Sequence, residues 1–369
     1  MPQLKKGKKN ITIILGTKAQ LIKMAPVMLE LRKRKIPYSF IFTGQHKETI
    51  TELLNIFKLE KPDFILYNGK DITRVLQMLI WGTRCLYKIL RSRKIFFSQK
   101  GFLLIQGDTA STVLGAIVGK LCGQEIGYVE AGMRSFDLLN PFPEEIFRII
   151  CSNLADVHFC PGQGPLRNSK KYKGVKINTK ANTLVNSLEI ALKNIQKTSI
   201  EMPKEKFCIV SIHRFENIFN KDRMKKIVKE ILLISARIKV LFIIHKPTEE
   251  KLKEFGLFDR LKNDINIDIR PKYDYFKFIK LLYNSEFIVT DGGGNQEESY
   301  YLGKPCLLMR SKTEHKEGKN INVVIFNQSK SILNKFFLKY GALKKGVTKP
   351  KANPSKVVVD YFQKMQVLI

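Results

Sequence analysis

The sequence predicts an α/β protein made of two Rossmann-like, doubly wound domains with a cleft between them. Its 369 residues are too many for one ordinary core and suit two domains of about 150 to 200 residues each. Short apolar runs alternate with longer amphipathic segments from end to end, which is typical of parallel sheets with helices on both faces. The pattern restarts at Phe207, after a polar linker at 197–203. A ligand would bind where the carboxyl edges of the two sheets meet.

Short apolar runs predict the individual strands. The predicted strands cover 11–15, 38–43, 102–106, 126–129 and 157–160 in the first half, and 207–212, 240–244, 287–290 and 306–309 in the second. Between the first two strands, Leu21, Ala25, Met28 and Leu31 recur at spacings of four and three, which predicts one buried helix face.

The last segment of the chain reads as one amphipathic helix, and we expect it to pack back on the first domain. The predicted organisation is an N-terminal domain at 1–180, a C-terminal domain at 181–350 and a terminal helix at 351–369.

Composition and cysteine use narrow the class of protein. The chain is 44% hydrophobic and 27% charged, as in ordinary globular proteins. No apolar stretch approaches the ~20 residues that a membrane span needs, and the basic start at 1–6 shows no signal-cleavage pattern. Six cysteines without a Cys-x-x-Cys pair predict neither a disulfide framework nor a metal site. We expect a cytoplasmic protein.

A net charge of +32 raises the question of nucleic acid. The lysines are spread along the whole chain and match no nucleic-acid-binding motif, so we expect no nucleic acid partner. Segment 76–97 is a more specific indication of a partner than the net charge. It interleaves apolar side chains, including the only tryptophan, Trp81, with arginines and lysines. Such a helix suits either the surface of an anionic membrane or the face of a sheet.

Residues 291–298, Asp-Gly-Gly-Gly-Asn-Gln-Glu-Glu, say most about chemistry. Three glycines after a predicted strand let backbone N–H groups approach an anion, and the helix start behind them adds partial positive charge. Glu297 and Glu298 are expected in the first helical turn, where a carboxylate can accept hydrogen bonds from a ribose diol. The alternative is a tight turn whose acids complement the helix dipole. The glutamate pair favours a nucleotide diphosphate.

Acidic residues follow the strands of the first half. Asp108 comes directly after one predicted strand and Glu130 after the next, so both are expected at the same sheet edge. Glu144 follows Pro143, which suits the start of a helix. Carboxylates gathered at one edge shift each other's pKa values apart, which provides an acid and a base. The alternatives are helix caps for Asp108 and Glu130 and a helical ion pair between Glu144 and Arg148.

In the second half, His213 directly follows a predicted strand. A histidine that faces the cleft can donate to a phosphate or act as a general acid, although a lone strand-end histidine is more often structural. Arg214 beside it favours the diphosphate interpretation. His158 lies inside an apolar run and is expected to be a core residue with satisfied hydrogen bonds.

Together these segments resemble the non-hydrolysing UDP-N-acetylglucosamine 2-epimerase family over nearly the whole chain. The matching signatures cover 16–26, 106–109, 129–134, 143–148, 182–183, 213–217, 291–298, 303–305, 309–310 and 313–314, in the family's order. Each match alone is weak, but their order and spacing make the resemblance specific.

The resemblance implies a glycosyltransferase-B type fold that binds UDP in the second domain and the sugar over the first, with no cofactor and no metal. It implies interconversion of UDP-N-acetylglucosamine and UDP-N-acetylmannosamine, or of a close UDP-hexosamine analogue, for surface polysaccharide synthesis. In that reaction UDP is eliminated, C2 is inverted by reprotonation and UDP is added back. Opposed carboxylates and exclusion of water suit this chemistry. The resemblance also implies a homodimer.

The family's functional residues carry over by motif. The implied acid–base set is Asp108, Glu130 and Glu144, and His213 would serve the diphosphate or the leaving group. The implied substrate contacts are Lys18, Lys23, Arg134, Arg148, Arg214, Gly292, Gly293, Gly294 and Glu298. In some members UDP-N-acetylglucosamine also acts at a second, activating site. The residues that match part of that region are Gln45, His46 and His245.

The sequence departs from the family pattern at three places. Lys18-Ala19-Gln20 replaces Arg-Pro-Glu, so a point charge stands where a bidentate guanidinium is usual. Gly292 replaces a serine, and His315 replaces an arginine. All three changes fall on implied phosphate or sugar contacts, so the alternatives carry weight. One is a glycosyltransferase of the same fold that moves an N-acetylhexosamine to a lipid-linked or glycan acceptor, and another is a hydrolysing variant.

Overall fold

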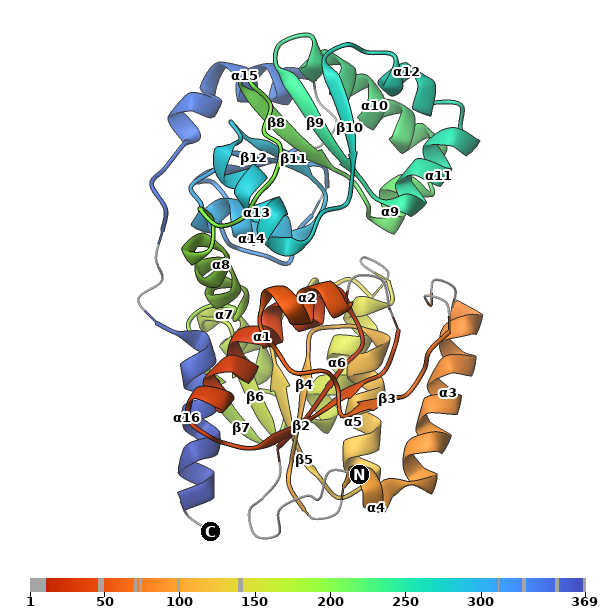
Figure 1. Cartoon of the computed structure of the whole chain (residues 1–369), viewed down its shortest axis with the longest axis vertical. Coiled ribbons are helices and arrows are strands. Elements are labelled where there is room, and N and C mark those ends of the chain that lie inside the picture. Colours follow the sequence, from red (N-terminus) through yellow and green to blue (C-terminus); the bar gives the residue numbers. More distant parts are fainter. Residues whose placement is uncertain are drawn as a thin grey trace. The chain divides into compact units, whose positions relative to one another are not determined.

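The computed structural model describes residues 11–45, 50–69, 72, 75–97, 100–138, 142–310, 312–326, 330–348 and 352–367. The chain divides into two compact units (Figure 1). The first comprises residues 1–187 together with 350–369, and the second comprises 188–349. The second boundary falls just before the terminal helix, which therefore belongs to the first unit.

The described strands of the first unit form a seven-stranded sheet in which all pairs are parallel. Its order is β3 (Phe64–Ile65), β2 (Tyr38–Phe42), β1 (Ile11–Leu15), β4 (Phe102–Gln106), β5 (Glu125–Val129), β6 (Val157–Cys160) and β7 (Val175–Asn178). The chain first builds outward from β1 and then returns to its other side at β4. The topological switch point therefore lies between β1 and β4.

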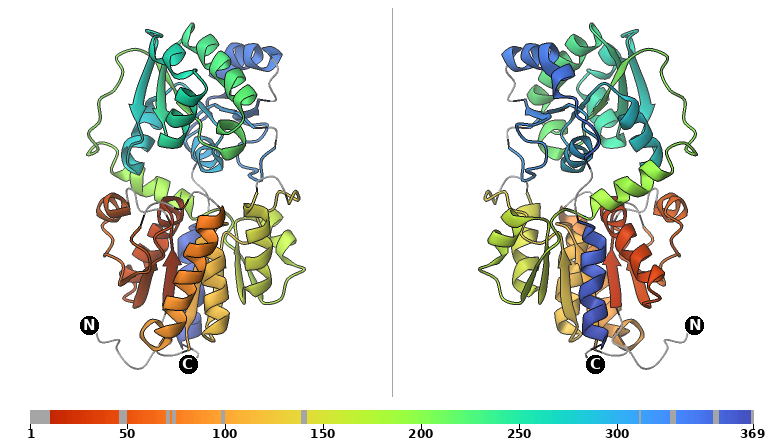
Figure 2. Two further views of the ribbon diagram at one scale, coloured as in Figure 1. Left: turned by 90° about the vertical axis from the view of Figure 1, so that its right-hand side faces the viewer. Right: turned by 90° about the vertical axis from the view of Figure 1, so that its left-hand side faces the viewer.

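Helices cover both faces of this sheet (Figures 1 and 2). They are α1 (Lys18–Lys33), α2 (Ile50–Ile56), α3 (Val75–Arg91), α4 (Arg93–Phe96), α5 (Ala110–Leu121), α6 (Glu144–Leu154), α7 (Gln163–Ser169), α16 (Pro354–Val367) and the start of α8 (Leu184–Lys193).

The second unit repeats the same architecture with a six-stranded parallel sheet. Its order is β10 (Ile267–Pro271), β9 (Lys239–Ile244), β8 (Phe207–Ser211), β11 (Ile288–Thr290), β12 (Cys306–Leu308) and β13 (Val323–Ile325). Its helices are α9 (Phe215–Ile218), α10 (Lys221–Ser235), α11 (Lys246–Glu254), α12 (Phe258–Lys262), α13 (Tyr275–Asn284), α14 (Gly293–Tyr301) and α15 (Lys330–Leu343). The switch point here lies between β8 and β11.

The sequence-based strand set is correct for every central strand but lacks β3, β7, β10 and β13. These four are the edge strands of the two sheets. Central parallel strands are buried on both faces and read as continuous apolar runs, whereas an edge strand is partly exposed and mixes polar residues into its pattern. Ile267-Asp268-Ile269-Arg270-Pro271 shows this mixture.

The terminal helix α16 packs on the first unit, as the apolar pattern predicts (Figure 2). Phe362 is fully buried, and its ring lies 5.0 Å from that of Phe102 and 5.7 Å from that of Phe159. Arg34 Nη1 donates to Asp360 Oδ1 at 2.6 Å at the rim of this contact. Because α16 also lies against α1, α1 is buried well beyond the single face that its spacing predicts.

In the described part of the chain, no helix is both long and apolar enough to cross a membrane. All six cysteines are free thiols, and those in β6, β8 and β12 are buried. His158 is likewise a core residue of β6, and one of its ring nitrogens lies 3.0 Å from the Lys173 carbonyl oxygen.

Candidate active site

The first unit gathers its polar residues where β1, β4 and β5 end. Asp108 follows β4 and Glu130 follows β5, and the two strands are parallel neighbours with Gln106 paired to Val129. The prediction that both acids share one sheet edge is therefore confirmed. The helix-cap alternative is wrong for Asp108, because Thr109 caps α5. It is also wrong for Glu130, because in the described chain the next helix is α6, which begins at Glu144 with Pro143 as its cap.

Glu130 is the most tightly held of these acids. It is 8% exposed and has a φ of +69°. Residues other than glycine rarely adopt this backbone conformation, so the surrounding structure must stabilise it. Lys23 Nζ donates to both carboxylate oxygens at 2.7 Å, and Asn182 Nδ2 donates to Oε1 at 2.7 Å. Gln106 Nε2 donates to Oε2. The carboxylate is thus fixed in one orientation beside a cation.

Gln20 organises the neighbouring loop. Its Oε1 accepts from the backbone N–H groups of Gly16 at 2.9 Å and Thr17 at 3.2 Å, which completes a capping box at the start of α1. Its Nε2 donates to the carbonyl of Gln106 at 2.7 Å and to Thr112 Oγ1 at 3.0 Å. The residue that departs from the family pattern therefore joins the loops on both sides of the switch point, a role that its position in the sequence did not reveal.

Arg148 links Asp108 to a buried carboxylate. Its guanidinium pairs with Asp108 and lies 3.3 Å from Glu145 Oε2. Glu145 is fully buried and also pairs with Arg134. Glu145, the residue after Glu144, is therefore a carboxylate partner of Arg148. Glu144 is the partly exposed first residue of α6, and its ion pair with Arg148 stays a prediction.

Backbone groups complete the shell around Glu145. The N–H groups of Ser135 and Phe136 donate to its carboxylate at 3.0 and 3.2 Å. Burial alone would raise the pKa of the Glu145 carboxyl, but the Ser135 N–H, Arg134 and Arg148 together hold it below its ordinary value. Glu145 is therefore an ionised anchor that orients Arg134 and Arg148.

Tyr128 shows that Asp108 and Glu130 share one electrostatic environment. Its hydroxyl donates to the carbonyl of Gly107 at 2.9 Å and holds the turn before Asp108. Burial raises the pKa of Tyr128 well above its ordinary value; the charges of Asp108 and Glu130 add to the rise, and that of Arg148 opposes it. Asp108 is 31% exposed and Glu130 is 8% exposed, so the carboxylate of Asp108 is the more accessible of the two.

The second unit places its polar residues at the ends of β8 and β11, again beside the switch point. Asp291 is fully buried and accepts from the backbone N–H groups of His213 at 3.0 Å and Arg214 at 3.0 Å, and from Asn217 Nδ2 at 2.9 Å. It therefore shapes the loop that carries His213, a role that the sequence did not reveal. Burial lowers the pKa of His213; Asp291 opposes this, and Arg214 and Lys272 add to it. His213 is thus neutral near pH 7.

The three glycines of the predicted phosphate loop do not have unusual backbone angles. At the first two, the lack of a side chain matters because neighbouring groups approach the backbone closely. Gly292 caps α14 with a φ of −83°. A Cβ on Gly292 would lie 2.9 Å from His213 Cε1, and one on Gly293 would lie 2.4 Å from His315 Nε2. A Cβ on Gly294 would meet nothing within 4 Å. Of the three glycines, Gly292 and Gly293 thus each lie against an imidazole ring, and Gly294 borders open space. The unpaired N–H groups of the helix start suit an anion.

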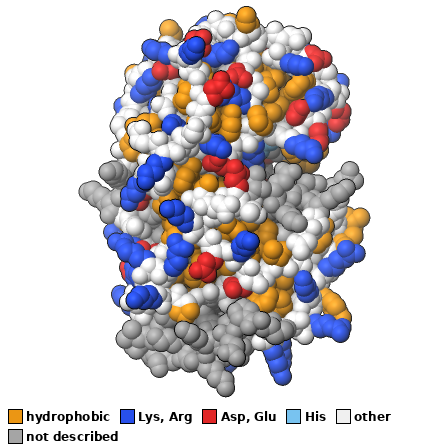
Figure 3. Space-filling view, viewed as in Figure 1, with side chains coloured by type: hydrophobic (Ala, Val, Ile, Leu, Met, Phe, Trp, Pro, Cys, Tyr) orange, Lys and Arg blue, Asp and Glu red, His pale blue; other side chains and the backbone are white. Residues whose placement is uncertain are grey.

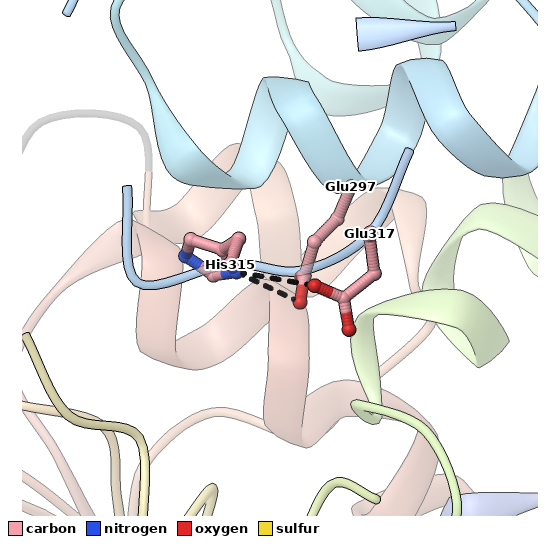
Figure 4. Close-up of side chains that lie close together, drawn as sticks. All are labelled: Glu297, His315 and Glu317. Atoms are coloured by element: carbon pink, nitrogen blue, oxygen red, sulfur yellow. Dashed lines mark hydrogen bonds and ion pairs between the residues drawn. The ribbon is translucent and has the colours of Figure 1, made fainter. Parts of the chain in front are cut away.

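The two glutamates of this stretch differ from the prediction. Because α14 begins at Gly293, Glu297 and Glu298 lie in its second turn and not in its first. Glu298 is buried, and burial together with the charge of this carboxylate raises the pKa of Tyr275 well above its ordinary value. Glu297 Oε1 instead lies 3.1 Å from His315 Nδ1 (Figure 4).

Comparison with known proteins decides the family. A model of the family described as UDP-N-acetylglucosamine 2-epimerase matches residues 29–352. The UDP-N-acetylglucosamine 2-epimerase of Methanococcus maripaludis is 35% identical over 341 residues, which cover 88% of this chain and 90% of that protein. The chain belongs to the UDP-N-acetylglucosamine 2-epimerase family.

Solved structures of this family have the same fold. The crystal structure of the Methanocaldococcus jannaschii UDP-GlcNAc 2-epimerase in complex with UDP-GlcNAc and UDP matches 96% of this chain and 99% of its own, with a TM-score of 0.84 and 28% identity. The Neisseria meningitidis UDP-GlcNAc 2-epimerase bound to UDP-GlcNAc also has a TM-score of 0.84, at 25% identity, and it covers 96% of this chain and 100% of its own. The expected two-domain, glycosyltransferase-B type fold is confirmed.

Within this epimerase framework, the described residues expected at an activating site belong to different units, Gln45 to the first and His245 to the second. Gln45 Oε1 accepts from the Ser111 hydroxyl at 2.7 Å and from its N–H at 3.1 Å, so it braces the start of α5. His245 caps α11, and its ring stacks on that of His213 at 4.6 Å between centroids. His46 lies outside the described residues. A second nucleotide site stays a prediction.

Three residues of the epimerase's second unit also offer ligand atoms for a metal. One atom each from Glu297, His315 and Glu317 lies within 4.8 Å of the others. Burial alone would lower the pKa of His315, but Glu297, Glu314 and Glu317 outweigh it and raise the pKa to about 9. The cluster is therefore an imidazolium held by carboxylates at neutral pH, and a metal would have to displace that proton.

Proposed function

We propose that this protein is a UDP-N-acetylglucosamine 2-epimerase that interconverts UDP-N-acetylglucosamine and UDP-N-acetylmannosamine, or a close UDP-hexosamine analogue. Family membership over residues 29–352 carries the proposal. The polar groups at the two switch points support it, because one sheet edge supplies carboxylates and the other supplies a helix start for an anion. A product destined for surface polysaccharide is part of the same proposal.

The first unit would perform the proton chemistry at C2. In this proposal Asp108, Glu130 and Glu144 are the acid–base set. Glu130 has a fixed orientation and the adjacent cation of Lys23, and Asp108 is exposed and paired with Arg148. Two carboxylates on one site can remove the C2 proton from one face of the sugar and return it to the other. Lys18 and Arg134 complete the proposed sugar and phosphate contacts.

The second unit would hold UDP during the reaction. The backbone at Gly292, Gly293 and Gly294 would bind the diphosphate, with the neutral His213 and the cationic Arg214 beside it. Glu298 would accept from the ribose diol. Retention of UDP is essential, because re-addition completes the epimerisation, and a fixed array of donors stabilises the departing diphosphate without reorganisation.

Product analysis tests the reaction. Purified protein is incubated without nicotinamide cofactor, separately with UDP-N-acetylglucosamine and UDP-N-acetylmannosamine, and followed by phosphorus and proton NMR. We expect both reactions to reach the same mixture of nucleotide sugars. Stoichiometric release of UDP with free hexosamine would indicate a hydrolysing enzyme. Absence of turnover until a glycan or lipid-linked acceptor is added would indicate a glycosyltransferase.

We also propose that the outward side of α3 forms an interface with a second copy of the chain. Helix α3 has two apolar sides. Trp81, Cys85 and Ile89, four residues apart, are buried against the unit. The opposite side, the α3 face, is exposed and consists of Leu76, Leu79, Ile80, Tyr87 and Leu90. Hydrophobic and basic side chains lie together over α3 on the edge of the first unit in Figure 3. A contiguous exposed apolar surface of this kind is typical of a protein–protein interface.

An anionic membrane is the competing occupant, because α3 contains three basic residues and no acidic one. Light scattering and sedimentation with anionic liposomes separate the two. We expect a dimer that the double substitution Leu76→Glu and Tyr87→Glu converts to a monomer, while Leu338→Glu, at an exposed leucine of α15, leaves it intact. A monomeric wild-type protein that sediments with liposomes would contradict the second copy.

A further inference from the structure

His315 lies against the start of the helix that faces the proposed diphosphate. It belongs to the loop after β12, and its side chain is 7% exposed. The Cβ position of Gly293, the first residue of α14, is 2.4 Å from His315 Nε2 and 2.5 Å from Cδ2. The ring edge therefore touches the point at which the unpaired N–H groups of α14 begin.

Carboxylates hold the opposite side of the ring. His315 Nδ1 lies 3.1 Å from Glu297 Oε1 and 3.8 Å from Glu317 Oε2. Figure 4 shows the second ring nitrogen turned away from these two carboxylates. Glu314 Oε1 lies 3.7 Å from that nitrogen, Nε2. One ring nitrogen, Nδ1, thus faces Glu297 and Glu317, and the other, Nε2, lies near both Glu314 and the side of Gly293.

The loop that carries His315 is itself tied to α14. Gln296 Nε2 donates to the carbonyls of His315 at 3.2 Å and Glu317 at 2.9 Å, and Thr313 Oγ1 donates to Gln296 Oε1 at 2.8 Å. The backbone N–H of His315 donates to Thr313 Oγ1 at 3.2 Å. These hydrogen bonds hold the backbone of the loop beside α14, so the residue that carries the ring stays next to the helix start.

Three carboxylates face His315, and two guanidinium groups pair with one of them. The described groups that face it from α14 and its own loop are Glu297, Glu314 and Glu317. Arg214, from the loop after β8, and Arg310 pair with Glu314 at 3.4 and 3.0 Å. Burial and the neighbouring Arg214 lower the pKa of Arg310 from its ordinary value, and Glu314 opposes this. Buried Tyr301, close to Glu297 and Glu317, has its pKa raised by burial and by these charges, so it stays neutral.

We propose that protonated His315 is a binding cation of the diphosphate site and that the affinity for UDP depends on its proton. This inference rests on the proposed function, because it takes the start of α14 as the diphosphate site. An arginine would supply a permanent positive charge there. His315 instead supplies a positive charge that the neighbouring carboxylates stabilise at neutral pH and that the ring loses in alkaline solution, when it releases its proton. The affinity for UDP should therefore fall as pH rises through about 9, the pKa of the ring. Because linkage is reciprocal, bound UDP should raise the pKa of His315.

Histidine NMR tests the linkage directly in the wild-type protein. The chain has five histidines, and the signal absent from His315→Gln identifies His315. We expect its pKa near 9 in the free protein and a clear upward shift when UDP saturates the site. His158 is an internal control, because this core residue of the first unit should not respond. A pKa of His315 that stays constant while UDP binds would contradict the proposal and reduce the ring to a structural ion pair.

Calorimetric titration with UDP at several pH values adds a second readout. Wild-type affinity should drop by about tenfold between pH 8 and 10 relative to His315→Gln, because a required proton costs up to about tenfold per pH unit above its pKa. Titration of UDP itself is common to both proteins and cancels. His315→Arg should bind more tightly than His315→Gln at pH 10. Equal pH profiles for wild type and His315→Gln would contradict the inference, and absence of UDP binding at every pH would instead contradict the proposed function. If His315→Gln misfolds, the wild-type NMR response still decides.

Discussion

At the scale of single residues, Glu130 is the proposed base or acid whose surroundings are best defined. Lys23, Asn182 and Gln106 fix its carboxylate. Glu130→Gln keeps the size of the side chain and removes the charge, so we expect C2 exchange to fall by about 10²- to 10⁴-fold, the usual contribution of a general acid or base. UDP binding should persist, because its proposed contacts lie in the second unit. Exchange is measured by proton NMR and UDP binding by calorimetry.

Glu125→Gln is the matched control for this substitution, since Glu125 lies at the opposite end of the same strand, β5. It should leave both readouts near wild type. Loss of UDP binding together with exchange in Glu130→Gln would show that Glu130 is structural. Unchanged exchange would remove Glu130 from the acid–base set.

Glu145 leads to a prediction about stability and pH. Its carboxylate is buried between Arg134 and Arg148, and removal of one partner of a buried ion pair costs about 3–5 kcal/mol. We expect Glu145→Gln to lower the free energy of unfolding by about this amount at pH 7. Because the folded-state pKa is depressed, this stabilisation is complete above the unfolded-state pKa of about 4.3 and is lost as pH falls through the folded-state pKa.

Urea unfolding at pH 7 and at pH 3.5 to 4 measures this dependence. The difference between wild type and Glu145→Gln should narrow at the lower pH. Glu60→Gln, at an exposed carboxylate of the same unit, should differ little from wild type at either pH. A difference for Glu145→Gln that is constant with pH would contradict the assignment of Glu145 as an ionised anchor.

Sequence patterns predicted where the candidate residues lie in the fold better than they predicted the contacts of each residue. Asp108, Glu130 and His213 could be placed at sheet edges because each follows an apolar strand. Glu145 was missed because Glu144 and Glu145 both lie at helical spacing from Arg148, and local spacing does not show which one faces the core. The contacts of Gln20 and Asn182 span 86 and 52 residues of sequence, so no local pattern contains them.

At the scale of elements, a glycine substitution in α14 tests whether the start of this helix binds the diphosphate. Gly294 has open space around its Cβ position, and so does Gly341 inside α15. Alanine stabilises a helix relative to glycine by up to about 1 kcal/mol, so neither Gly294→Ala nor Gly341→Ala should destabilise the fold. If the diphosphate approaches the backbone at Gly294, alanine there should lower the affinity for UDP by about 10- to 100-fold, the loss of a charge-assisted hydrogen bond. Gly341→Ala should bind UDP normally.

Thermal unfolding and calorimetry with UDP measure both effects of these glycine substitutions. Normal UDP affinity in a stable Gly294→Ala protein would place the diphosphate elsewhere. Equal losses in both variants would indicate a general effect on the second unit.

The edge strands of the two sheets were not predicted because their sequences differ from those of the central strands. A central strand such as β1 or β8 is buried throughout and is visible in sequence as an apolar run. The edge strands β7 and β10 are only partly buried, and their polar residues resemble loop sequence. Helix α3 shows the converse, because its two apolar sides read as one amphipathic segment and only the structure separates the buried side from the exposed one.

At the scale of the whole molecule, the same architecture occurs twice with different chemistry. Each unit has a parallel sheet whose switch point lies between its first strand, β1 or β8, and the strand that restarts on the other side, β4 or β11. The first switch point carries carboxylates and the second carries a helix start with His213, Arg214 and His315. An elimination and re-addition of UDP needs both sets, and loss of either should stop the reaction at a different step.

Deuterium incorporation tests the central claim most directly. Wild-type protein is incubated with UDP-N-acetylglucosamine in deuterated water, and the C2 position is followed by proton NMR. Deuterium should enter C2 of both nucleotide sugars without accumulation of free UDP, because the C2 proton is removed and replaced from solvent and the eliminated UDP is added back. Release of UDP without exchange at C2, or formation of the epimer with its original C2 proton, would contradict the account.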